Sequence, residues 1–175
     1  MSESFRIAVP GDAESLSRLV NSAYRGEASK RGWTTEAGLL GGQRTDPDTL
    51  RSLISVNSNA ILLMHRDADL IGCVLLQQKT QSAYLGMLTV LPDLQAGGIG
   101  RRLLAAAEDW VFENWLLRLI EMTVIRQRSE LIVWYERRGY VNTHRTEPFP
   151  YGDEKFGLPK RPDLEFVVLE KHLCR

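Results

Sequence analysis

Residues 88–104 read LTVLPDLQAGGIGRRLL, and this stretch decides both the fold and the kind of ligand. A strand ends at Pro92, a loop with three glycines follows, and a helix begins near Ile99. Glycine lets the backbone approach a ligand closely, and the free N–H groups at a helix start attract phosphate oxygens. Arg101 and Arg102 add positive charge there. The pattern predicts a phosphate-binding loop, with a plain glycine-rich turn as the alternative.

Two other phosphate-binding motifs fit this stretch less well. A Walker loop requires Gly-Lys followed by Ser or Thr, and the stretch contains no lysine. A dinucleotide-binding fingerprint requires a third glycine at the position that Leu103 occupies. The stretch therefore favours a phosphate loop of a different kind.

Strand and helix patterns alternate on both sides of the loop. Strands are expected at 5–9, 60–65, 70–78, 83–91, 117–125, 140–144 and 164–170, and helices after Asp12, from Asp46-Pro47, at 99–116 and at 129–138. The strands between 60 and 91 should form an antiparallel meander. Residues 25–45 and 146–163 are long loops, the first with room for a short helix. The alternation predicts a layered α/β (α+β) fold.

Composition excludes several classes of protein. The chain has 175 residues, which suits a single domain over 1–175, and its 22 lysines and arginines balance 22 aspartates and glutamates. A nucleic-acid binder would need a basic excess, and residues 60–64, among the longest apolar stretches, fall far short of a membrane span of ~20 residues. The N-terminus shows no secretory pattern, so a cytoplasmic protein with Cys73 and Cys174 reduced is expected.

A second motif, Trp134-Tyr135-Glu136-Arg137-Arg138-Gly139-Tyr140, follows the loop at a distance of one helix and one strand. The pair of motifs, in this order, resembles the GCN5-related N-acetyltransferases, the GNAT superfamily. The first resembles that family's acetyl-CoA signature and the second its Leu-Tyr-Glu-x-x-Gly-Phe segment. The resemblance covers roughly residues 5–171. It implies a central, mixed but mostly antiparallel sheet of about seven strands, flanked by about four helices.

The resemblance also implies where acetyl-CoA would bind. Backbone groups of Leu88 and Val90 would hold the pantetheine arm, and the N–H of Leu88 or Thr89 would polarise the acyl carbonyl. The pyrophosphate would lie on the loop amides, which are those of Gln95, Ala96, Gly97, Gly98, Ile99, Gly100 and Arg101. Many members carry an asparagine before the last helix, which is absent here. Gln127 or Arg128 would take its place.

Acetyl transfer to an amine needs a proton acceptor and a proton donor for the leaving thiolate. Tyr135 matches the tyrosine that many members place near the CoA sulfur. The alternative is that it is a core tyrosine on the apolar face of the last helix. Glu121 is the best carboxylate for the base if it faces the cleft, with Thr123 on the same side of its strand. A water-mediated base and a merely ion-paired Glu121 are the alternatives.

The resemblance places the acceptor pocket between the two long loops. Trp33, Glu36 and Arg44 of the first loop and Tyr151 of the second are the candidate substrate residues, unless these loops only cover apolar surface. The implied activity is acetylation of a primary amine of a small molecule through a ternary complex. Alternatives are a protein N-terminal or lysine acetyltransferase and a non-catalytic CoA-binding module. A homodimer is conceivable, and the three histidines form no metal-binding pattern.

Overall fold

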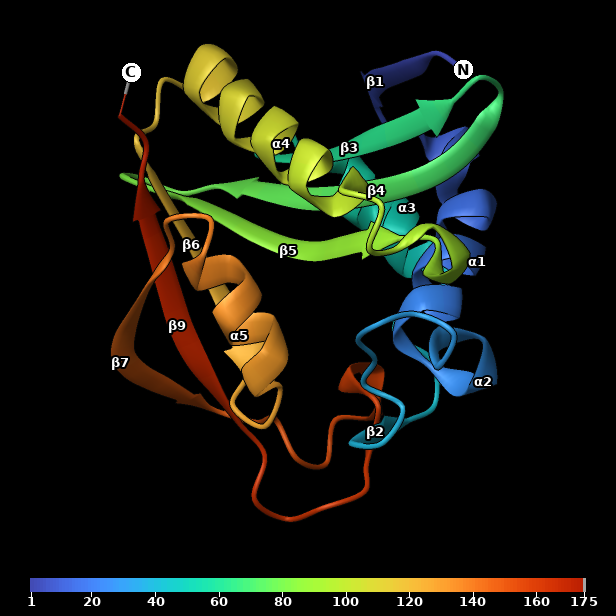
Figure 1. Cartoon of the computed structure of the whole chain (residues 1–175), viewed down its shortest axis with the longest axis vertical. Coiled ribbons are helices and arrows are strands. Elements are labelled where there is room, and N and C mark those ends of the chain that lie inside the picture. Colours follow the sequence, from blue (N-terminus) through green and yellow to red (C-terminus); the bar gives the residue numbers. More distant parts are fainter. Residues whose placement is uncertain (175) are drawn as a thin grey trace.

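The computed structural model in Figure 1, which describes residues 1–174, is built on a seven-stranded sheet. The strand order is β1-β3-β4-β5-β6-β9-β7, and every neighbouring pair is antiparallel except β5 and β6. The strands are β1 (Glu3–Ile7), β3 (Asn59–Arg66), β4 (Asp69–Gln78), β5 (Ala83–Val90), β6 (Leu119–Ile125), β7 (Val141–Pro148) and β9 (Glu165–His172). This is the mixed, mostly antiparallel sheet that was predicted.

The helices cover both faces of the sheet. They are α1 (Ala13–Tyr24), α2 (Gly26–Ser29), α3 (Pro47–Ser55), α4 (Ile99–Trp115) and α5 (Ser129–Glu136). On β3, Leu62 and Met64 belong to one core cluster together with residues of α4 and α5, whereas Ile61 and Leu63 belong to another with α1 and α3. Successive strand residues point to opposite faces, so this run of apolar residues fills two cores.

The pairing of β5 with β6 positions the functional site. The two strands pair only at Ala83 with Ile120 and at Tyr84 with Glu121, and they then separate. Side-chain hydrogen bonds also cross this junction. In addition, β5 carries an irregularity against β4, where Met87 has a φ of 54°, in the left-handed region. We call the point where β5 and β6 separate the fork.

The predicted elements are confirmed, with differences at the loops. The first long loop contains α2 and β2 (Leu40–Gly41), and β2 pairs with β8 (Leu158–Pro159) of the second loop. The strand expected at 140–144 continues to Pro148, because its later residues pair with β9. The two long loops are therefore joined to each other by a two-stranded antiparallel ribbon.

The expected helix signals have mixed outcomes. Asp46 caps α3 by accepting a hydrogen bond from the backbone N–H of Thr49. Asp12 lies before α1 but its side chain does not cap that helix, because it pairs with Arg6 and accepts from the Val9 N–H. Both cysteines are free, and none of the helices within residues 1–174 has the length and apolar character needed to cross a bilayer.

Candidate functional site: two cavities that meet at the fork

The glycine-rich loop takes the form that a phosphate loop requires. Gly98 precedes α4 with a φ of 75°, and Ala96 has a φ of 67°, so the chain turns through left-handed conformations before the helix. No side chain caps α4, and the N–H groups of a first helical turn have no intrahelical partner. A Cβ on Gly100 would lie 3.4 Å from the Trp134 ring. A larger residue would therefore enter the space between the two helices.

A cavity of about 180 Å³ opens beside this loop, and we call it the phosphate-loop cavity. Its lining includes Leu88, Thr89, Val90, Gln95, Ala96, Gly98, Gly100, Arg101, Arg128, Trp134, Tyr135 and Arg138. The lining thus contains three arginines and no carboxylate. Burial lowers the pKa of Arg138, and the charges of Arg101 and Arg137 lower it further. Arg128 pairs with Glu36 behind the lining, whereas Arg101 and Arg138 make no ion pair within residues 1–174, so the cavity suits an anionic ligand.

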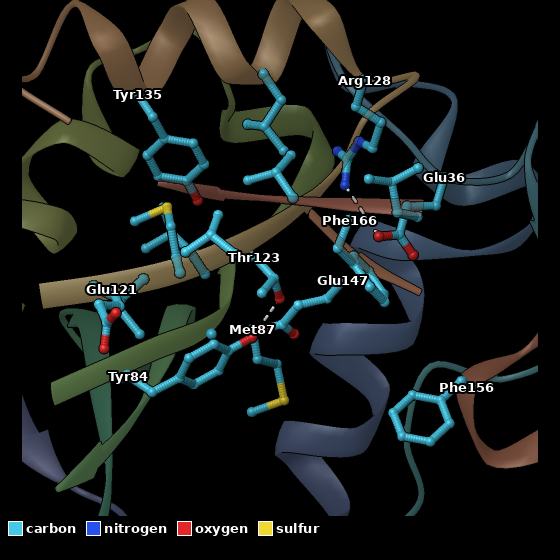
Figure 2. Close-up of a pocket in the computed structure, with 18 of the residues that line it drawn as sticks. Glu36, Tyr84, Met87, Glu121, Thr123, Arg128, Tyr135, Glu147, Phe156 and Phe166 are labelled. Atoms are coloured by element: carbon cyan, nitrogen blue, oxygen red, sulfur yellow. Dashed lines mark hydrogen bonds and ion pairs between the residues drawn. The ribbon is translucent and has the colours of Figure 1, made fainter. Parts of the chain in front are cut away.

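A larger cavity of about 570 Å³ lies in the fork, and Figure 2 shows side chains converging on it from β5, β6, β7, α5 and the loops. We call it the acceptor cavity. Its walls include Tyr84, Met87, Glu121, Thr123 and Val124 of the two separating strands, together with Pro150, Phe156 and Phe166. The irregular pairing of the sheet is what creates this space.

Tyr135 lines both cavities, and in Figure 2 its hydroxyl points into the acceptor cavity. Its ring packs edge-on against Trp134 and Tyr140, at centroid distances of 5.0 and 5.6 Å. Burial raises its pKa well above the ordinary value for a phenol, so it stays protonated. Within residues 1–174 its hydroxyl has no hydrogen-bond partner that the structure records, which leaves the proton free for a ligand.

Glu121 faces the acceptor cavity, as the base hypothesis requires, but it is already engaged. It accepts a hydrogen bond from the Ser82 hydroxyl at 2.7 Å and forms an ion pair with Arg145 at 3.2 Å. The Ser82 bond is the main cause that lowers the pKa of Glu121, and Arg145 adds to it. Two residues further along β6, the hydroxyl groups of Thr123 and Tyr84 form a hydrogen bond at 2.9 Å. These side chains connect β5 to β6 where the backbone pairing ends.

Two residues that sequence reasoning did not single out also belong to the site. Glu147 of β7 points into the acceptor cavity in Figure 2, and its side chain makes no hydrogen bond or ion pair within residues 1–174. Its position was hidden because a loop was expected there. Tyr24 lines both cavities and donates to the Leu88 carbonyl at 2.8 Å. Its place in the apolar stripe of α1 made it look like a core residue.

The predicted substrate residues divide between the cavities. Glu36 and Arg44 line the acceptor cavity, whereas Trp33 lines the phosphate-loop cavity, with its ring 6.3 Å from that of Trp134. Tyr151 lines neither cavity. Its hydroxyl donates to the Arg161 carbonyl and accepts from the Leu164 N–H, so it holds its own loop together.

The two residues expected to replace the missing asparagine also separate. Arg128 is buried, lines both cavities, and bonds Glu36 at 3.2 Å and Thr34 at 2.8 Å. Gln127 lines neither cavity and donates instead to the carbonyl of Asp163. The turn before α5 thus presents only one of the two side chains to the cavities. No group of metal-ligating side chains occurs among residues 1–174.

Comparisons with solved structures agree with this architecture. The chain resembles PaiA N-acetyltransferase from Thermoplasma acidophilum, solved with coenzyme A, with a TM-score of 0.72 and 21% identity over 98% of this chain and 99% of that one. The ribosomal-protein-S18-alanine N-acetyltransferase of Escherichia coli gives 0.71 and 14%, over 99% and 96%. A variant of the spermidine N-acetyltransferase SpeG from Vibrio cholerae gives 0.70 and 17%, over 97% and 93%.

These structures define the class as an acyltransferase fold. A family model described as an acetyltransferase (GNAT) domain matches residues 35–149, which is more than half of the chain. The chain therefore belongs to the GNAT acetyltransferase family, a family of acyltransferases. A search of curated protein sequences gives no match.

Proposed function

We propose that this protein transfers the acetyl group of acetyl-CoA to a primary amine of a small molecule by direct attack in a ternary complex. The observation that carries this proposal is that the two cavities share their inner wall. Tyr24, Leu88, Arg128, Leu131 and Tyr135 line both. An amine in the acceptor cavity would thus meet an acyl group that enters from the phosphate-loop cavity, with no need for a covalent enzyme intermediate.

The residues of the phosphate-loop cavity fit a CoA ligand. The left-handed Gly98 and the open first turn of α4 suit a pyrophosphate, and the arginines on a lining without carboxylates suit the ligand's other negative charges. When bound, acetyl-CoA supplies a reactive acetyl thioester. The Leu88 carbonyl already accepts from Tyr24 and the Val90 carbonyl from Gln95, so we assign pantetheine contacts to the remaining backbone groups of Leu88, Thr89 and Val90.

The chain's own part in the chemistry is to move protons at the fork. The Tyr135 hydroxyl keeps its proton and is positioned to donate it to the leaving sulfur. Two carboxylates that line the acceptor cavity, Glu121 of β6 and Glu147 of β7, could accept the amine proton. Glu147 has no ion-pair partner within residues 1–174, whereas the pKa of Glu121 is lowered, which makes Glu121 the weaker base.

The walls of the acceptor cavity favour a small acceptor over a protein. Arg25 donates to the carbonyls of Gly41 and Phe156, and β2 pairs with β8, so the two long loops are joined to each other. A polypeptide acceptor requires an open cleft, whereas joined loops with aromatic residues make a walled pocket. Acetylation of a protein amine remains the alternative activity, as does CoA binding without catalysis. A cytoplasmic location and a homodimer remain predictions.

Two measurements test the proposal. Thermal unfolding with and without CoA tests the first cavity: at 100 times the dissociation constant, binding should add about 2.7 kcal/mol of stability. Thiol release from acetyl-CoA in the presence of amine and peptide panels tests the second. Turnover with small amines supports the proposal, turnover with peptides alone supports the protein acetyltransferase, and binding without any turnover supports the non-catalytic module.

A further inference from the structure

The acceptor cavity carries more positive than negative side chains. Its lining contains the cations Arg44, Lys79, Arg128 and Arg145 and the carboxylates Glu36, Glu121 and Glu147. Behind Glu36 lies another guanidinium, that of Arg25, at 3.0 Å. A polyamine with several positive charges would be repelled by such a wall, whereas an acceptor that also carries a negative charge would be attracted. The charge balance therefore bears directly on the class of the acceptor.

One of these cations is available to a ligand inside the cavity. Arg128 is neutralised by Glu36, Arg145 bonds Glu121 and Glu170, and Lys79 is exposed at the rim. Arg44 is half-buried and makes no ion pair within residues 1–174. A partly desolvated guanidinium without a counter-charge is costly unless an anion joins it.

The position of Arg44 is fixed from two sides. The Asn21 side chain accepts from the backbone N–H of Arg44 at 2.7 Å and of Thr45 at 3.2 Å, and it donates to the Thr45 carbonyl at 2.9 Å. The guanidinium lies over the Tyr24 ring, 5.5 Å from its centroid. Since Tyr24 lines both cavities, this stacking holds the charge of Arg44 beside the wall where they meet.

We propose that the acceptor is an amine that also bears a carboxylate, such as an amino acid, and that Arg44 binds this carboxylate. This rests on the proposed acetyl transfer and names its substrate class. A planar guanidinium matches a carboxylate with two parallel hydrogen bonds. The unpaired carboxylate of Glu147 lines the same cavity and receives the ammonium end of the acceptor. A phosphate group would satisfy the same guanidinium, and the experiment separates the two.

The test compares amines that differ only in the anionic group. L-amino acids, their primary amides, the corresponding decarboxylated amines, O-phosphoethanolamine and spermidine are offered with acetyl-CoA, and thiol release gives kcat/KM. The carboxylates should exceed their amides by about 10- to 100-fold, the range for a hydrogen-bonded charged pair. Arg44→Gln should bring that ratio near one without changing the thermal shift with CoA. The control, Arg51→Gln, removes an arginine of α3 that pairs with Glu14 and Asp48 and lines neither cavity.

The outcomes are distinct. Preference for spermidine or phosphoethanolamine, equal rates with acids and amides, or an unchanged ratio in Arg44→Gln overturns the proposal. If no amine reacts, calorimetric titration of the CoA-bound protein with the amino acids decides, because binding that Arg44→Gln abolishes supports the carboxylate site and absent binding rejects it. Failure of the proposed function appears separately, as a missing thermal shift with CoA or as a shift without turnover of any amine. Where the shift is missing, the titration is read on the protein alone.

Discussion

The side-chain oxygen of Gln95 accepts a hydrogen bond from the backbone N–H of Trp33 at 3.1 Å, and so joins the first long loop to the phosphate loop. The amide nitrogen of Gln95 donates to the Val90 carbonyl, also at 3.1 Å. A Cβ on Gly32 would lie 2.2 Å from the same side chain, so the contact is close. One glutamine thus connects the end of β5, the glycine-rich loop and the segment that carries Glu36 and Arg44.

We expect Trp33→Ala to raise the KM for acetyl-CoA more than that for the acceptor, because its ring lines the phosphate-loop cavity. The sequence alone predicted the reverse order. The Trp33 ring is 42% exposed, and losing its contact with the ligand should weaken CoA binding by about 10-fold. Initial rates with each substrate varied in turn measure both constants. A larger effect on the acceptor would restore the original assignment of Trp33 to the acceptor pocket.

Gly98→Asp should abolish the thermal shift with CoA. The substitution forces a side chain into a φ of 75° and adds negative charge at the expected phosphate position. Gly11→Asp is the matched control, because Gly11 has no positive φ and no atom within 4 Å of its Cβ position. If Gly98→Asp folds and keeps the full shift, the loop does not bind the phosphates.

Tyr135→Phe should lower turnover by about 10²-fold or more, with little change in CoA binding. The phenyl ring keeps its packing against Trp134 and Tyr140, and only the protonated hydroxyl is lost. Burst or steady-state thiol release measures the rate, and a thermal shift measures CoA binding. Wild-type turnover would reject the acid role and leave Tyr135 as a packing residue.

Glu121 and Glu147 should differ in how much activity is lost when each is replaced by glutamine. Glu147→Gln should cost about 10²-fold in kcat/KM, whereas Glu121→Gln should cost less, because Glu121 is a weakened base. The sign of the pH effect follows from the lowered pKa: Glu121 stays ionised above that pKa and loses its charge only as the pH falls through it. A base role for Glu121 would therefore place the acid limb of the rate below the ordinary pKa of a glutamate. If Glu121→Gln loses more activity than Glu147→Gln, and the unmodified protein shows such an acid limb, Glu121 is the base.

The sequence predicted the elements well because its strands and helices have clear periods. On β3, for example, a strand was expected at 60–65, and the structure shows why this run is apolar throughout: its residues fill the cores on both faces of the sheet. The glycine-rich loop was predicted from its three glycines before a helix, and the structure adds that Gly98 is left-handed there. Local patterns therefore suffice to predict a phosphate loop and the elements on either side of it.

The acceptor side depended on long-range contacts that no local pattern encodes. Tyr151 looked like a pocket aromatic, but its hydroxyl bonds backbone groups of its own loop. Glu147 was read as part of a loop, because its strand is defined by pairing with β9 and its sequence shows little alternation. Gln127 and Arg128 are neighbours in sequence, and only the direction of the turn before α5 separates their roles.

The short pairing at the fork has a mechanical consequence. Backbone pairing between β5 and β6 is limited to two residue pairs, and the Tyr84–Thr123 hydrogen bond and that of Ser82, just before β5, with Glu121 add to it. By contrast, β4 with β5 and β6 with β9 are paired along most of their length, so the fork is the place where the sheet has the fewest backbone hydrogen bonds. A ligand that contacts both β5 and β6 adds links between the two parts of the sheet. Occupancy of the cavities is then expected to slow amide exchange in strands that touch no ligand.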